Sequence, residues 1–109
     1  MIILLYLFII SGAVLVVLSV PMIMGKIPPN GLYGFRVKKT MENPDIWYPV
    51  NAYSGKWLLV AGLGLVLAAV ALFFVPGISL EVYSYAVLAA WVILFTVAMI
   101  ASIRFMNSL

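Results

Sequence analysis

The chain has 109 residues, of which 67% are hydrophobic and only 8% are charged, and its formal net charge is +3. A soluble domain normally holds about 25% charged residues and buries only about two thirds of its chain surface, so it could not hide so many apolar side chains. These figures exclude a soluble enzyme, a disordered segment and a nucleic-acid-binding module, and they predict an integral membrane protein.

The first predicted element is a membrane helix over residues 2–24, a stretch without any charged side chain. At about 1.5 Å per residue it is long enough to cross a hydrocarbon core of about 30 Å. A secretory signal peptide would start with positive charge, carry a shorter apolar run and end in a cleavage motif of small residues. This stretch has none of these features, so we expect a helix that is retained.

The predicted loop that follows, residues 25–56, carries five of the six basic residues: Lys26, Arg36, Lys38, Lys39 and Lys56. Positive charge gathers on the cytoplasmic side of membrane proteins. Together with Arg104 after the last span, the loop predicts a cytoplasmic C-terminus and an outside N-terminus. We expect Lys38, Lys39 and Lys56 to contact the headgroups of anionic lipids.

The loop is rich in turn-forming and aromatic residues, which a passive linker does not need. Asn30-Gly31 predicts a turn. Asn43-Pro44 fits a helix N-cap followed by proline at the first helical position. A helix that starts there would place Trp47, Asn51 and Ser54 near one face, with Tyr48 beside them. Pro49 predicts a kink or a break in such a helix.

Two further membrane helices are predicted over residues 57–75 and 83–103, each close to the roughly 17–25 residues that a span requires. Pro76-Gly77 predicts the turn between them. In a bilayer these segments must be helical, because every backbone amide needs an internal partner. The expected fold is therefore all-α: one domain, residues 1–109, with three transmembrane helices in the cytoplasmic membrane and a structured cytoplasmic loop between the first two.

Small residues recur in the spans at the spacing that lets membrane helices approach closely: Gly64 with Ala68, Ala86 with Ala90, and Ala98 with Ser102. These pairs indicate either packing within the three-helix bundle or a face for a homodimer or a larger complex. The other polar side chains of the spans are hydroxyls, and none is charged near the middle of the membrane. Ion pathways normally need such charged groups, so a stand-alone transporter or pump is disfavoured.

Within this arrangement of spans, an ordered set of loop residues is familiar: Pro29-Asn30, Gly34-Phe35-Arg36, Thr40, Trp47, Asn51 and Gly55. The tryptophan comes about eleven residues after the arginine, and the asparagine and glycine follow it. In this order and spacing the chain resembles the SdpI family of small bacterial and archaeal membrane proteins. The resemblance covers essentially the whole chain.

The resemblance implies a function by binding. The family's namesake is a larger membrane protein that protects its producer against a secreted toxic peptide and holds a transcriptional repressor at the membrane. This chain resembles the shorter, single-domain members. We therefore expect immunity to, or sensing of, a membrane-active peptide, with a peptide toxin or a cytoplasmic regulator bound by the loop motif. The expected binding residues are Asn30, Gly34, Arg36, Thr40, Trp47, Asn51 and Gly55.

Several motif residues also have a purely structural interpretation. The Arg36 guanidinium either grips a phosphate or carboxylate of a partner, or it pairs with Glu42, Asp45 or loop carbonyls and holds the loop in shape. Asparagine favours turns and local backbone bonds, so the two loop asparagines also fit a role in the loop itself. Trp47 is expected to act as an anchor in the headgroup layer.

Two other classes of function stay open. The small-residue helix faces fit a structural or accessory subunit of a larger membrane complex. A lipid-modifying enzyme would have to rely on Arg36 with Glu42 and Asp45. Because the chain has no cysteine and no histidine, we expect no catalytic residue, no metal site and no cofactor. The expected partners are membrane lipids, with no nucleic acid.

Overall fold

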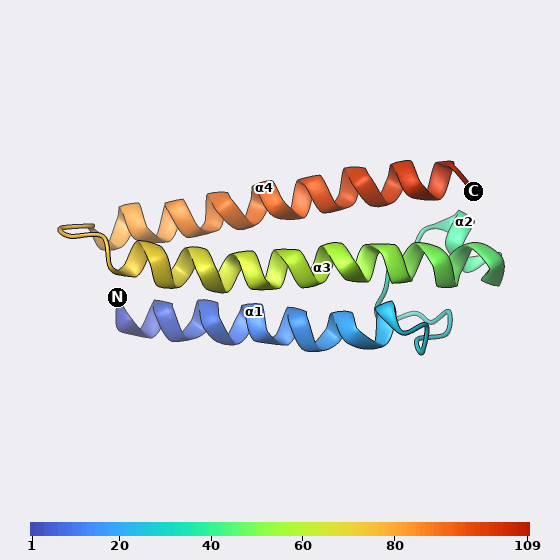
Figure 1. Ribbon diagram of the computed structural model, residues 1–109, viewed down its shortest axis with the longest axis horizontal. Coiled ribbons are helices and arrows are strands. Elements are labelled where there is room, and N and C mark those ends of the chain that lie inside the picture. Colours follow the sequence, from blue (N-terminus) through green and yellow to red (C-terminus); the bar gives the residue numbers. More distant parts are fainter.

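The computed structural model describes residues 1–109 and is all-helical, as the sequence predicts. Three long helices lie side by side: α1 (Ile2–Ile23), α3 (Pro44–Phe73) and α4 (Leu80–Asn107) (Figure 1). The short α2 (Lys38–Met41) belongs to the segment between α1 and α3. All three long helices are long and apolar enough to cross a membrane. The chain is therefore a multi-pass membrane protein.

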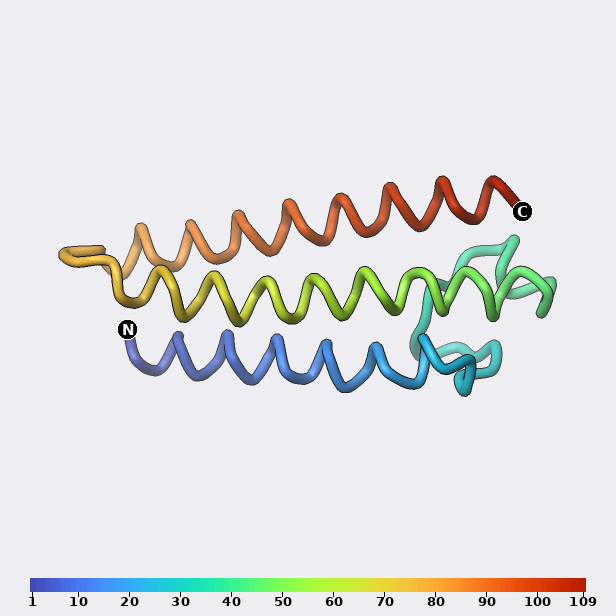
Figure 2. Tube along the Cα trace, in the orientation of Figure 1, coloured from blue at the N-terminus to red at the C-terminus, as the bar shows by residue number.

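The central helix is α3, with α1 on one side and α4 on the other (Figures 1 and 2). Since α3 is antiparallel to both neighbours, α1 and α4 are parallel to each other. The turn between α3 and α4 lies beside the N-terminus, at what we call the hairpin end. There Gly77 has a φ of 73°, in the left-handed region that favours glycine. Residues 24–43 fold against the opposite end, near the C-terminus, which we call the loop end (Figure 2).

The start of α3 differs from the predicted start of the second span. The sequence predicts a loop through residue 56, but α3 begins at Pro44 and continues through Pro49. The predicted cap is confirmed, because the Asn43 side chain accepts the N–H of Asp45 at 3.0 Å. Packing explains why the helix survives its internal proline: Trp47 and Val50, on either side of it, are fully buried.

The helix α4 is longer at both ends than the predicted span of residues 83–103. It begins at a second cap that the sequence analysis missed, in which the Ser79 hydroxyl accepts the N–H of Val82 at 3.1 Å. At its other end the Lys39 ammonium donates to the carbonyl of Met106 at 3.2 Å. A cation at this position complements the helix dipole, and it ties the loop to α4.

The closest contact between α1 and α3 lies at Gly12 and Gly62. A Cβ atom on Gly12 would lie 2.7 Å from the carbonyl oxygen of Gly62, and a Cβ on Gly62 would lie 2.7 Å from that of Gly12. Such close backbone contact is how membrane helices associate without a hydrophobic driving force. Between α3 and α4, the Ser54 hydroxyl donates to Ser102 at 2.8 Å. Ser102, which belongs to one of the predicted small-residue pairs, therefore packs inside the bundle.

Near the hairpin end, a small apolar core joins all three long helices: Leu5, Leu65, Ala69, Tyr83 and Val87. The Tyr83 hydroxyl donates to the carbonyl of Ala69 at 2.8 Å, so the buried ring has a partner for its polar end. The bundle is thus fixed near one end by this core and at the other by the loop.

Candidate functional site

The first turn of the loop is organised by the side-chain amide of Asn30. Its oxygen accepts the N–H groups of Leu32 and Tyr33, both at 2.8 Å. Its nitrogen donates to the carbonyls of Pro28 at 2.8 Å and Tyr33 at 3.0 Å. Because both donors and the oxygen of the amide are engaged within the turn, Asn30 shapes the loop.

The side chain of Asn51, on α3, hydrogen-bonds the loop backbone that follows this turn. Its side-chain oxygen accepts the N–H of Phe35 at 2.6 Å, and its nitrogen donates to the carbonyl of Trp47 at 2.9 Å. The adjoining Gly34 has a φ of 119°. A Cβ atom on Gly34 would lie 2.7 Å from the Asn51 oxygen and 3.0 Å from the Trp47 ring. Only glycine fits both the backbone angle and this space.

Two further motif residues, Thr40 and Trp47, are buried under the loop. The Thr40 hydroxyl accepts the N–H of Val37 at 3.0 Å and donates to the carbonyl of Phe35 at 2.8 Å. The Trp47 indole N–H donates to the carbonyl of Ile27 at 2.7 Å, and its ring is fully buried. The ring is therefore covered by the protein itself and does not face lipid headgroups, in contrast to the exposed anchor that the sequence suggests. It lies between α3 and the loop, where the polar edge of the indole finds a backbone partner.

The last motif residue, Gly55, lets the end of α1 approach α3. A Cβ atom there would lie 2.9 Å from the Ile23 side chain and 3.1 Å from its backbone nitrogen. From the loop side, the Tyr33 hydroxyl donates to the carbonyl of Leu18 at 3.0 Å. The motif thus connects the loop to both α1 and α3.

The motif region leaves a few side chains on the surface. Leu32 is 89% exposed, and Arg36 and Lys38 are also exposed. The Arg36 guanidinium donates to the carbonyl of Gly31, and it forms no ion pair with Glu42 or Asp45. Of the predicted structural partners Glu42, Asp45 and the loop carbonyls, Arg36 therefore binds a loop carbonyl. Its remaining N–H groups point to no other protein acceptor and are available to a partner.

The basic residues assigned to lipid contact have different surroundings. Lys38, Lys39 and Lys56 are all exposed, and Lys39 also donates to a carbonyl at the end of α4. Their contact with headgroups remains a prediction. The chain has no group of three or more acidic, histidine or cysteine side chains that could hold a metal ion.

The sequence of residues 26–106 matches the model of the SdpI/YfhL protein family. The matched region includes the complete motif, all of α3 and nearly all of α4. No curated protein and no solved structure matches the chain.

Proposed function

We propose, because the chain belongs to the SdpI/YfhL protein family, that it protects its host against a membrane-active peptide, or senses that peptide, by binding through the loop. One observation carries the proposal. The motif side chains Asn30, Trp47 and Asn51 hydrogen-bond the backbone of the loop, and the loop held in this way presents Leu32 and Arg36 on its surface.

A preformed loop is suited to recognition because it loses little conformational entropy when a partner binds. Asn30 and Asn51 already fix the turn and the segment after it. What a partner meets is therefore a shaped surface, in which the motif supports the contact residues from below.

The exposed groups fit the chemistry of a peptide that enters membranes. The apolar side chain of Leu32 is 89% exposed, and its exposure to water is unfavourable. A partner that covers it with an apolar group therefore gains free energy of binding. Arg36 offers charge-assisted hydrogen bonds to a carboxylate, such as a peptide C-terminus or an acidic patch of a regulator. An amphipathic peptide at the membrane surface carries both kinds of group. The predicted orientation would place the loop at the inner surface, where such a peptide or a cytoplasmic regulator could meet it.

The test is sensitivity of the host to membrane-active peptides after deletion of the gene. We expect the deletion to sensitise cells and the wild-type gene to restore resistance. Arg36→Ala and Leu32→Ser should restore resistance poorly. Arg104→Ala is the matched control, since it removes an exposed arginine from the same end of the molecule. Unchanged sensitivity after deletion, with all variants present in the membrane at equal amounts, would contradict the proposal.

Purification from membranes in mild detergent distinguishes this function from the accessory-subunit alternative. A peptide or regulator that Arg36→Ala loses and Arg104→Ala retains would support recognition by the loop. A larger partner in equal stoichiometry that both variants retain would instead assign the contact to the helix faces, and would favour the subunit role.

A further inference from the structure

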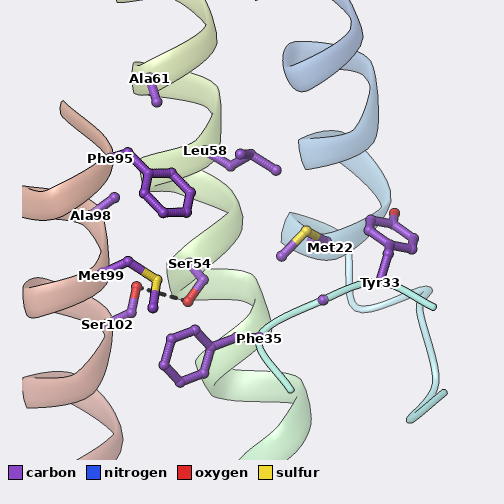
Figure 3. Close-up of a pocket in the computed structure, with 11 residues that line it drawn as sticks. Met22, Tyr33, Phe35, Ser54, Leu58, Ala61, Phe95, Ala98, Met99 and Ser102 are labelled. Atoms are coloured by element: carbon purple, nitrogen blue, oxygen red, sulfur yellow. Dashed lines mark hydrogen bonds between the residues drawn. The ribbon is translucent and has the colours of Figure 1, made fainter. Parts of the chain in front are cut away.

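Two separate cavities lie between α1 and α4 along one face of α3, and we call the line that they form the groove. Near the loop end it contains a cavity of about 170 Å³ (Figure 3). Ser54, Leu58 and Ala61 of α3 form its floor, and Phe35 of the loop lies at its loop end. Farther toward the hairpin end, a second cavity between α1 and α4 is lined by Leu65 of α3 and Trp91 of α4.

Both cavities follow a single face of α3. Ser54, Leu58, Ala61 and Leu65 succeed one another at spacings of three and four residues. From Ser54 to Leu65 the helix rises about 16 Å at 1.5 Å per residue. Half of a hydrocarbon core of about 30 Å is about 15 Å. The groove therefore runs for about the depth of one membrane leaflet.

The loop end of the groove is polar. The hydroxyls of Ser54 and Ser102 both line the cavity and bind each other at 2.8 Å (Figure 3). Ser102 is only 2% exposed. Two hydroxyls carry two protons, and their mutual bond uses one of them. No other hydrogen bond of the structure uses the second proton, so the pair keeps one donor for an acceptor in the cavity.

This donor lies at a defined depth. Ser102 precedes Arg104, the last charged residue of α4, by two positions or about 3 Å along the helix axis. A charged side chain near a helix end reaches the headgroup layer. The serine pair is therefore placed at the boundary between the headgroup layer and the hydrocarbon core, where the ester carbonyls of a glycerophospholipid join its acyl chains.

The size and the lining of the groove decide between occupants. A cavity of about 170 Å³ is small beside the pockets of about 300–1,000 Å³ that hold drug-sized ligands, so it suits a slender group. A charged or strongly polar ligand would find no ionic partner, because no charged side chain lines either cavity. A single hydrocarbon chain fits the length and the apolar lining. The rim residues Phe95 and Met99 are exposed, so such a chain can enter sideways from the bilayer.

We propose that the groove binds one acyl chain of a glycerophospholipid from the leaflet on the loop side. The ester carbonyl accepts a hydrogen bond from the serine pair, Ser54 and Ser102. The methylene groups lie along α3 as far as Trp91. Neither Leu32 nor Arg36 lines this site, so its tests do not depend on the proposed function.

The first test is lipid retention, measured by native mass spectrometry after reconstitution with dioleoylphosphatidylcholine. This neutral probe minimises the electrostatic attraction of the basic loop. Ala98→Leu adds carbon to the cavity wall, whereas Ala89→Leu makes the same change on an exposed face of α4 that lines neither cavity. We expect wild type and Ala89→Leu to retain one lipid, and Ala98→Leu to retain about tenfold less. Equal retention in Ala98→Leu would overturn the proposal.

The second test places the chain in the groove. A phosphatidylcholine with a brominated acyl chain is titrated into the detergent-solubilised protein, and quenching of tryptophan fluorescence is recorded. The contribution of Trp91 is the difference between wild type and Trp91→Phe. We expect its quenching to saturate at one lipid per protein and to be lost in Ala98→Leu. Quenching that rises without saturation, and equally in wild type and Ala98→Leu, would come from the surrounding bulk lipid and would also overturn the proposal.

The serine pair has its own test. Ser102→Ala removes one hydroxyl, and the remaining Ser54 can turn to a carbonyl of its own helix. We expect lipid retention to fall about fivefold, the change that corresponds to one hydrogen bond of ordinary strength. Retention equal to wild type would remove the serine pair from the site.

Discussion

The side-chain amide of Asn51 accepts and donates backbone hydrogen bonds, as a neighbouring strand does in a sheet. It accepts the backbone N–H of Phe35 and donates to the carbonyl of Trp47. Asn51 is only 2% exposed, so these groups have no water to turn to if the amide is lost. A buried backbone N–H without a partner costs about 1–3 kcal/mol. The folded loop therefore depends on a contact across sixteen positions of the chain.

Gly34 provides the sharpest test of this arrangement. Gly34→Ala would force a side chain into a φ of 119° and bring a Cβ to 2.7 Å from the Asn51 oxygen. We expect the loop to lose about 1–3 kcal/mol of stability. Hydrogen exchange of the amides between residues 26 and 43, in mild detergent, should be correspondingly faster.

Gly31→Ala is the matched control for this prediction. A Cβ atom there meets nothing within 4 Å, and Gly31 does not have a positive φ. We expect its exchange to stay close to that of wild type. If both alanine variants exchanged at the wild-type rate, the loop would not depend on the contact between Gly34 and Asn51.

The sequence singles out the motif residues, but it does not show which backbone groups of the loop they bind. Asn43 is identified as a cap because capping is local and needs only the residues that follow. Trp47 is assigned to the headgroup layer, because nothing local indicates that Ile27, twenty positions earlier, supplies its partner. Periodicity relates residues along one helix, and it does not reach across a loop that folds back on that helix.

The membrane spans are predictable for a simple physical reason: the hydrocarbon thickness sets how many apolar residues a span must have. The start of α3 is not, because hydropathy falls near Lys56 while the helix continues back to Pro44. There the burial of Trp47 and Val50 outweighs the local preference of Pro49. The contact between Gly12 and Gly62 is equally invisible in the sequence, since no spacing rule links positions on two helices.

The close contact between Gly12 and Gly62 predicts that substitutions at two glycines of α3 differ in their cost in stability. In Gly62→Val the new side chain meets the backbone carbonyl of Gly12, so α1 and α3 must move apart. In Gly64→Val it meets the end of the Leu94 side chain, which can turn away. We expect Gly62→Val to cost about 1–3 kcal/mol and Gly64→Val clearly less.

The measurement is the midpoint of thermal aggregation in one detergent, with wild type in the same experiment. Gly62→Val should aggregate several degrees below both Gly64→Val and wild type. If Gly64→Val were the less stable of the two, the tighter constraint would lie between α3 and α4, and α1 would be the more loosely held helix.

Charge divides the molecule into two unlike ends. All six basic residues lie in the half of the molecule that ends in the loop, together with Glu42 and Asp45, while Glu81 is the charged side chain of the hairpin end. Such an asymmetry of positive charge determines the orientation in which a chain inserts into the membrane, because positively charged segments resist translocation. The predicted orientation follows from this asymmetry, and the proposed recognition of a peptide or regulator at the inner surface depends on it.

The orientation can be measured directly, because the chain has no cysteine and any label must report an introduced one. Leu32→Cys places a thiol at a loop position that is 89% exposed, and Pro76→Cys places one at the exposed hairpin turn. We expect an impermeant maleimide to label Pro76→Cys on intact cells and to label Leu32→Cys only after the cells are made permeable. The wild-type chain, which has no thiol, is the blank. The reverse pattern would put the loop outside, where a secreted peptide would reach Leu32 and Arg36 without crossing the membrane. Protection by binding would then remain physically possible, but contact with a cytoplasmic regulator would not.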